Sequence, residues 1–236
     1  NALAVRVVIK IKEDMIADYI NGNNDSVIVL PEGEYTFHND VEGSGTLEAN
    51  GTNVTLNAQD NELNVGNSGS YGIIAKNGAE VVVNDANVVS GGGAYGATNG
   101  SQLTVNSGSA HVNSASTSGR YVFYAEGEGT VVTVNGGNYS WDSTKNQKRA
   151  YVYCGAGAKV IINDGTFGKA STRSGYTDGI LGTGETIIYG GTFGFNPTRW
   201  VAAGCTVKKD GANWVVTKGD PATTSAELKD SIDKME

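Results

Sequence analysis

The chain has 236 residues, of which 34 are glycine and 3 are proline, and only 18% are charged, with a net charge of −8. The length suits one or two ordinary domains or one repeat array, and high glycine with little proline excludes a collagen-like chain and a Pro-rich linker. An acidic chain repels phosphate backbones, which argues against nucleic-acid binding, and the sequence lacks the run of about 18 apolar residues that a membrane span needs.

Residues 1–26 are predicted to form an N-terminal strand and a capping helix. Residues 1–12 alternate apolar and polar side chains, as in a strand, and they show no signal-peptide pattern. Residues 12–20 carry apolar side chains at helical spacing, from Met15 onward. Asn21-Gly22 is expected to end this helix, which would then cover one end of a core.

Residues 27–195 are predicted to form a repeat array. A short strand, a bend at asparagine and a new strand start recur along the chain, most clearly in residues 157–167. Self-similarity of this kind indicates a solenoid, and each unit has room for two or three short strands per coil. The bend residues are separated by 27, 22, 29 and 28 positions, and they are Asn57, Asn84, Asn106, Asn135 and Asn163, with Tyr189 in the sixth place.

The strand before each bend asparagine alternates in character. Its apolar set is predicted to stack into an interior column, because a single coil cannot bury its apolar side alone. The members of this column are Val54, Leu56, Val81, Val83, Leu103, Val105, Val132, Val134, Val160 and Ile162. Asparagine tolerates the left-handed conformation that a bend requires, and stacked amides can hydrogen-bond from coil to coil. We therefore interpret the asparagine ladder as structural.

A second landmark opens another strand in most units. It is a tyrosine in four of them, and we align these positions as equivalents: Tyr71, Tyr95, Tyr121 and Tyr151, with Gly179 in the next unit.

Residues 196–219 are predicted to form a C-terminal hairpin cap. Two apolar β-runs flank a turn at residues 208–211. Trp200 opens the first run and Trp214 lies in the second. Both rings are expected to cover the open end of the core, as terminal caps of solenoids do.

Residues 220–236 are predicted to form a terminal helix or a linker to a partner. A capping box at Thr224 and Glu227 begins the helix. The apolar residues that share one face at heptad-like spacing are Leu228, Ile232 and Met235. A helix this short is marginal alone in water, so we expect it to dock on its own solenoid, pair with copies of itself, or bind a partner.

Two segments of the sequence resemble known proteins. Residues 27–37, two β-runs around a Pro-x-Gly turn, resemble the opening coil of pectin-lyase-like right-handed β-helix proteins. Gly-Gly-Thr-Phe at residues 190–193, followed by Asn-Pro and by residues 200–207, resembles the end of Gly-Gly-Thr-Phe repeat proteins, which are β-helical surface proteins of gut bacteria and of some of their phages. The resemblance implies an all-β fold, a single-stranded right-handed parallel β-helix.

The sequence offers no clustered catalytic site. Asp85 and Asp164 are the best aligned carboxylates, but they lie three coils apart, which at about 4.8 Å per coil separates them by roughly 14 Å. A glycosidase needs two carboxyl groups about 5–9.5 Å apart. His38 and His111 belong to non-neighbouring coils, which gives only a weak metal signal. We expect no catalytic residue, cofactor or metal.

The two cysteines, Cys154 and Cys205, are interpreted as buried thiols. A disulfide between them is the alternative, and sequence alone does not test its geometry.

The most individual loop spans residues 139–149 and is basic and aromatic. Its candidate contacts with a glycan or a protein neighbour are Trp141, Lys145, Lys148 and Arg149. A decorated loop without a partner is the alternative.

The function expected from these features is a non-enzymatic structural or display module outside a cell. The leading version is a component of a phage virion surface, such as a head fibre, a capsid decoration or a tail appendage. A bacterial cell-surface adhesin or glycan-binding module is the alternative, and a polysaccharide lyase or glycoside hydrolase is less favoured. The expected partners are other structural proteins, copies of the chain as in a homotrimer, or host glycans. The phage or gut-bacterial context comes from the resemblance alone.

Overall fold

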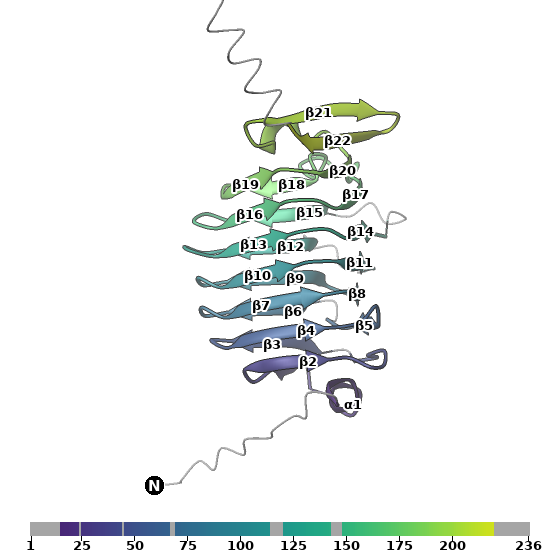
Figure 1. Cartoon of the computed structure of the whole chain (residues 1–236), viewed down its shortest axis with the longest axis vertical. Coiled ribbons are helices and arrows are strands. Elements are labelled where there is room, and N and C mark those ends of the chain that lie inside the picture. The colour runs from purple at the N-terminus through teal and green to yellow at the C-terminus, as the bar shows by residue number, and fades with distance from the viewer. Residues whose placement is uncertain are drawn as a thin grey trace, which may run out of the picture.

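The chain folds into a parallel β-solenoid, which the computed structural model describes for residues 15–23, 25–43, 45–66, 69–113, 120–142 and 148–219. Each full coil gives one strand to each of three sheets, so that strands far apart in sequence lie side by side (Figure 1). The fold class expected from the sequence, an all-β parallel β-helix, is therefore confirmed. Below, the N-terminal end is called lower and the C-terminal end upper, as in Figure 1.

The three sheets are named here A, B and C. Sheet A contains β1 (Val27–Val29), β3 (Thr46–Asn50), β6 (Tyr71–Lys76), β9 (Gly93–Thr98), β12 (Arg120–Glu126), β15 (Arg149–Cys154) and β18 (Ile180–Gly182). Sheet B contains β2 (Gly33–Thr36), β4 (Asn53–Asn57), β7 (Glu80–Asn84), β10 (Gln102–Val105), β13 (Val131–Val134), β16 (Lys159–Ile162) and β19 (Glu185–Ile188). Sheet C contains β5 (Glu62–Asn64), β8 (Ala86–Ser90), β11 (Gly108–Val112), β14 (Asn138–Trp141), β17 (Thr166–Lys169), β20 (Gly191–Gly194), β22 (Asn213–Lys218) and β21 (Cys205–Asp210).

The predicted interior column lies inside sheet B. Val81 pairs with Leu103, and the same register continues through Val132 and Val160. Every member of the column is at most 2% exposed. Burial of apolar area is the main stabilising term of such a core, at about 25 cal/mol per Å². The alternation read from the sequence is thus confirmed, because parallel coils in register bring like positions together.

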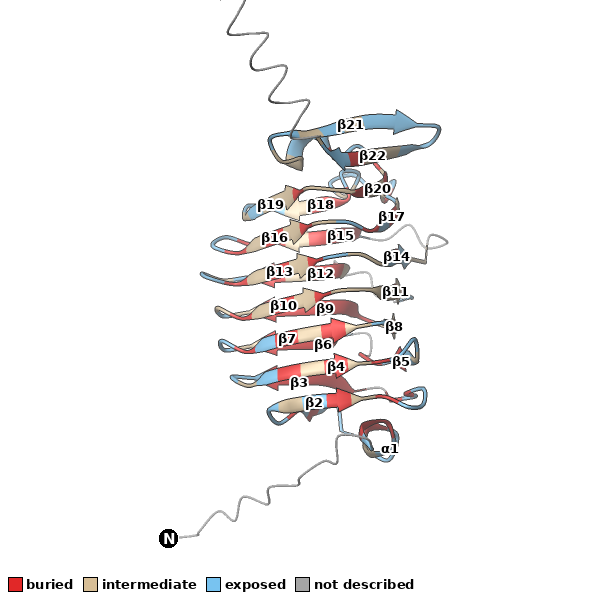
Figure 2. Ribbon diagram, viewed as in Figure 1, coloured by how far each residue is buried: buried red, intermediate tan, exposed pale blue. Residues whose placement is uncertain are grey.

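Aromatic rings fill the interior between sheets A and C. Phe167 and Phe193 stack with ring centroids 4.9 Å apart, and Tyr139 lies 5.0 Å from Phe167 and 4.7 Å from Phe123. Rings at these separations attract one another beyond their area burial. Figure 2 shows the resulting buried strand faces along the stack of coils.

A short helix covers the lower end of the core. α1 (Ile16–Asn21) buries Ile16 and Ile20 completely, while Met15 is 47% exposed. The expected helix is present but begins at Ile16, so Met15 is not on its buried face. The strand predicted in residues 1–12 lies outside the described residues. So does the predicted terminal helix with Leu228, Ile232 and Met235.

A hairpin closes the upper end by pairing with sheet C. β22 runs antiparallel to β20, with Phe193 opposite Trp214, and β21 runs antiparallel to β22. The turn lies slightly later than predicted: the strand β21 continues to Asp210, so that of residues 208–211 only Gly211 belongs to the turn at residues 211–212. Trp200 is not in a strand either, because it ends a 3₁₀ turn, Thr198–Trp200, where it is partly buried against the core. Most of the hairpin surface is exposed (Figure 2).

The alignment of the landmark tyrosines is right for Tyr71 and Tyr121, which both lie in register with Gly93, and wrong for Tyr95. Tyr71 pairs with Gly93, whereas Tyr95 pairs with Ile73, two positions further on. Tyr95 and Tyr151 are buried in the core, while Tyr71 and Tyr121 are only half-buried. The tyrosines therefore fall into an inner and an outer set.

Among the described residues, none of the helices has the length and the apolar run that a membrane crossing requires.

Candidate functional site

The bend asparagines form one continuous ladder along the corner between sheets B and C. Each side-chain amide nitrogen donates to the amide oxygen one coil below over 2.7 Å, from Asn84 to Asn57, Asn106 to Asn84, Asn135 to Asn106 and Asn163 to Asn135. This ladder therefore has a direction: every rung donates downward and accepts from above.

The two ends of the ladder differ. At the lower end, Asn57 donates to the Glu34 carboxylate over 2.6 Å, which satisfies its amide nitrogen. At the upper end, Tyr189 stands where the next asparagine would be, and no donor from the described residues reaches the Asn163 side-chain oxygen. The ladder therefore ends on an unused hydrogen-bond acceptor.

A second asparagine ladder, at the corner between sheets A and B, was missed by sequence reasoning. Asn77 donates to Asn50 over 2.9 Å, and Asn99 donates to Asn77 over 3.0 Å. Asn77 and Asn99 both have φ of 56°, the left-handed conformation that asparagine tolerates. The Asn-Gly pairs at residues 77–78 and 99–100 were the signal that could have revealed it.

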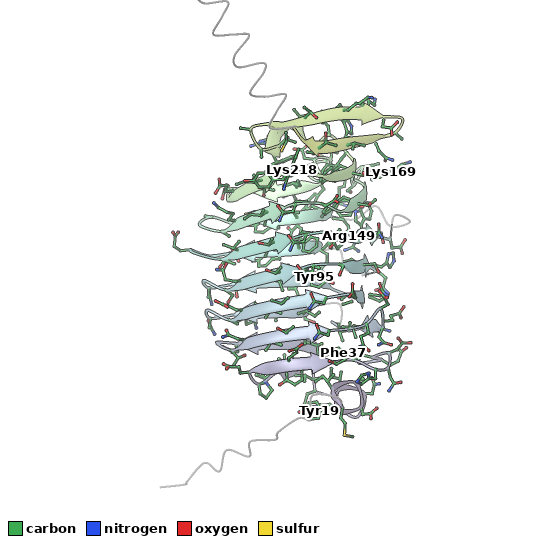
Figure 3. All side chains as sticks on the ribbon, viewed as in Figure 1. Tyr19, Phe37, Tyr95, Arg149, Lys169 and Lys218 are labelled. Atoms are coloured by element: carbon green, nitrogen blue, oxygen red, sulfur yellow. The ribbon has the colours of Figure 1, made fainter. Side chains whose placement is uncertain are left out.

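A recess of about 420 Å³ lies at the upper end of the first ladder, beneath the hairpin. It is lined by Asn163 and Asp164, by residues 189–192, and by residues 215–218 of β22. Figure 3 shows Lys218, the last residue of β22, at this end of the solenoid. The recess thus forms where the parallel coils give way to antiparallel pairing.

Glycines leave space around Asp164. Its register neighbours are Gly136 in the coil below and Gly190 in the coil above. The Gly190 backbone lies so close that an added Cβ would be 2.5 Å from the Asn163 carbonyl oxygen. Neither neighbour has a side chain, so the exposed Asp164 carboxylate meets no side chain directly above or below it.

The polar groups of the recess are of several kinds. One Asp164 carboxylate oxygen accepts from the Gly165 backbone N–H over 2.7 Å, and no donor from the described residues reaches the other. The Lys218 ammonium lies 5.6 Å from the centroid of the Tyr189 ring, within the range of a cation–π contact. The recess therefore combines free acceptors, a cation and an aromatic ring.

A tyrosine cluster on the outer face of sheet A is the other unusual surface. Tyr124 and Tyr153 stack with centroids 5.3 Å apart, and Tyr71 and Tyr121 lie 5.2 Å and 6.2 Å from Tyr124. The four rings project from β6, β12 and β15, and the Tyr71 ring covers part of β9, where an added Cβ on Gly93 would collide with it. All four rings are only partly exposed.

The environments of Tyr121 and Tyr124 disfavour the phenolate form. Burial, joined by the neighbouring Tyr176, raises the pKa of Tyr121 to about 12. Burial and then a hydrogen bond to Glu126 raise the pKa of Tyr124 above its usual range. The rings of this cluster therefore pack on one another, and its members Tyr121 and Tyr124 are neutral phenols at neutral pH.

The carboxylates singled out in the sequence are not brought together. Asp85 follows β7 and Asp164 follows β16, with the coils of β10 and β13 between them. Among the described residues, no group of three or more His, Cys, Asp or Glu side chains is placed to hold a metal ion. His111 instead shares a 2.9 Å hydrogen bond with Ser140.

The predicted contact residues of the 139–149 loop differ in how far they are exposed to solvent. Lys148 is exposed, and Lys145 lies outside the described residues. Trp141 is partly buried, with its ring 6.4 Å from that of Tyr151. Arg149 is only 1% exposed, and burial lowers its pKa, so the expectation of a surface contact through Arg149 is wrong. Arg149 is the first residue of β15 and lies in register with Arg120 of β12.

Both cysteines are free thiols. Cys154 is buried, and its single S–H lies 3.4 Å from the carbonyl oxygens of both Ala158 and Glu185 and can donate to either, while Cys205 is only partly buried. The alternative of a disulfide is therefore excluded in this structure. The prediction that both thiols are buried is right for Cys154 and wrong for Cys205, which is only partly buried.

No protein-family model matches the chain, and neither the curated proteins nor the solved structures yield a match.

Proposed function

We propose that this chain is a non-enzymatic structural and display module outside a cell, as a component of a phage virion surface such as a head fibre, a capsid decoration or a tail appendage. The observation that carries the proposal is a solenoid whose coils stack in register between two closed ends. A rod of this kind holds whatever lies at its ends at a fixed separation.

The internal construction supports stiffness. Two side-chain amide ladders tie the coils together at two corners, and an aromatic stack runs through the interior. Backbone pairing joins each coil to its direct neighbours in the stack, so the stability of the rod is approximately the sum of the interfaces between neighbouring coils. The resemblance of residues 190–207 to Gly-Gly-Thr-Phe repeat proteins supports the phage context and nothing in the geometry adds to it.

A bacterial cell-surface adhesin or glycan-binding module is the second candidate. The recess at Asn163 and Asp164 favours it, because unused acceptors beside a cation and an aromatic ring suit a hydroxyl-bearing ligand. A solenoid that displays such a recess fits either a virion or a cell surface.

Fractionation of the source culture tests the location. Quantitative mass spectrometry of purified particles and of washed cell envelopes is expected to find the chain in the particles at a fixed ratio to the major capsid protein. Enrichment in the envelopes instead would contradict the virion proposal and support the adhesin.

Light scattering on the full chain, and on a chain shortened by residues 220–236, measures whether that segment holds an oligomer together.

Incubation with a panel of polysaccharides tests the non-enzymatic part. No new reducing ends and no unsaturated products are expected over long incubation. Cleavage that persists after further purification of the chain would overturn the proposal in favour of a lyase or a glycoside hydrolase.

A further inference from the structure

We infer that the recess at the upper end of the asparagine ladder is a binding site for one unit of a neutral saccharide. The site consists of Asn163, Asp164, Tyr189 and Lys218. It does not depend on whether the solenoid is carried by a virion or by a cell. Its volume of about 420 Å³ falls in the range of about 300–1,000 Å³ that is usual for small-molecule sites.

The first recognition group is the end of the ladder. Asn163 uses its amide nitrogen to donate to Asn135 over 2.7 Å, so its oxygen remains as the acceptor that faces the coil above. In the lower coils the next asparagine fills this role, as Asn135 does for Asn106. A ligand hydroxyl that donates to the Asn163 oxygen would continue the ladder by one step.

The second group is the Asp164 carboxylate. One oxygen is engaged by the Gly165 backbone N–H, and the other takes no hydrogen bond from the described residues. Because Gly136 and Gly190 flank it in register, the free oxygen can be approached from the recess. A second ligand hydroxyl can donate to it, and hydrogen bonds to a charged acceptor are the stronger kind.

Lys218 and Tyr189 supply the complementary chemistry. The Lys218 ammonium is a donor with three protons, and it is exposed beside the Tyr189 ring at 5.6 Å. It can donate to the lone pairs of a ligand hydroxyl or ring oxygen. The partly exposed Tyr189 ring and Val215 offer an apolar surface to the C–H groups of a sugar ring.

This combination favours a neutral polyhydroxylated ligand over the other classes. Hydroxyl groups both donate and accept, so one sugar unit can satisfy Asn163, Asp164 and Lys218 together. A carboxylate or phosphate ligand would face the Asp164 charge and a chain of net charge −8. A purely apolar ligand would leave the polar groups of Asn163 and Asp164 unpaired, which costs free energy.

The test is a titration of the ¹⁵N-labelled full chain with neutral hexasaccharides of glucose, mannose, galactose and N-acetylglucosamine, with the galacturonate hexasaccharide as the charged counterpart. Saturable amide shifts are expected for at least one neutral probe, centred on residues 163–165, 189–192 and 215–218. Asp164→Asn is expected to weaken that binding about tenfold, as the loss of a charge-assisted hydrogen bond does.

Asp85→Asn is the matched control, because Asp85 holds the same repeat position but lies outside the recess and accepts a hydrogen bond from Ser107. It is expected to leave the affinity unchanged. The inference is overturned if no neutral probe gives saturable shifts, if only the galacturonate probe binds, if the shifts centre elsewhere, or if Asp85→Asn weakens binding as much as Asp164→Asn. Failure here leaves the fractionation result untouched, so the two proposals fail separately.

Discussion

Asp85 and Asp164 occupy the same position of the repeat, one residue after a ladder asparagine, and yet their surroundings differ. In the coil above Asp85 stands Ser107, whose hydroxyl donates to the carboxylate over 2.5 Å and accepts from the Asp85 backbone N–H over 3.2 Å. In the coil above Asp164 stands Gly190, and above that coil comes the hairpin. In a solenoid, therefore, the role of a side chain is decided by its neighbour one coil away.

The same contrast holds for the ladder itself. Asn106 has an amide above and an amide below, so both its donor and its acceptor are used within the fold. Asn163 has an amide below only. The middle coils are therefore closed to ligands at this corner, and the last coil is open.

Gly190→Ala should have the largest effect on stability. Its Cβ would stand 2.5 Å from the Asn163 carbonyl oxygen, whereas a Cβ on Gly136, the same repeat position two coils lower, would stand 3.4 Å from the Asn106 carbonyl oxygen. Overpacking of this kind costs about 1–3 kcal/mol, so the free energy of unfolding in urea should fall by that amount for Gly190→Ala. Gly136→Ala should remain near the wild-type value, and equal losses would contradict the register described here.

Asn106→Ala and Asn163→Ala compare the middle of the ladder with its end. The first removes two hydrogen bonds and the second removes one. Since each bond contributes about 1 kcal/mol net, the expected losses in free energy of unfolding are about 2 and about 1 kcal/mol. Both losses are measured by chemical denaturation under one set of conditions. Equal losses would contradict the view that each hydrogen bond of the ladder contributes separately to stability.

The outer tyrosine cluster is expected to make the stability of the protein depend on pH above pH 9. Burial raises the pKa of Tyr121 from 10.0 to about 12, so the folded state favours the neutral phenol. A raised pKa contributes stability that is fully present below pH 10 and is lost as the pH rises through 12. Unfolding midpoints measured between pH 9 and pH 12 should fall less for Tyr121→Phe than for the wild type. Parallel curves would contradict a buried, neutral Tyr121.

The smallest effects are expected at the two aspartates. Asp85→Asn weakens an exposed hydrogen bond from Ser107, which is worth at most about 1 kcal/mol. Asp164→Asn touches no side chain and should leave the urea midpoint unchanged. A destabilisation by Asp164→Asn larger than that by Asp85→Asn would mean that Asp164 supports the fold and is not free for a ligand.

The fold and the first ladder could be predicted from the sequence because both depend on periodic signals. Alternating residues such as Val81 and Val83 mark the inner face, and the spacing of the asparagines marks the coils. The recess could not be predicted, because it depends on the pairing of Gly191 with Val216 across an antiparallel strand. Tyr95 was misread for a related reason: Tyr71 and Tyr95 look alike in sequence, and only the register separates them.

The burial of Arg149 could not be foreseen either. A basic residue beside Lys148 is expected at the surface, whereas in the structure Arg149 belongs to β15 and is only 1% exposed. The composition of residues 139–149 indicates a basic, aromatic loop. Which of these residues a partner can reach depends on where the loop ends and the next strand begins.

A crystal structure of the full chain with the neutral hexasaccharide that binds most tightly is the most direct test of the contrast between the closed middle coils and the open last coil. We predict sugar density in the recess, with one hydroxyl on the Asn163 oxygen, one on Asp164 and an oxygen near Lys218. Density over Tyr121 and Tyr153 on the outer face of sheet A, with the recess empty, would contradict the account.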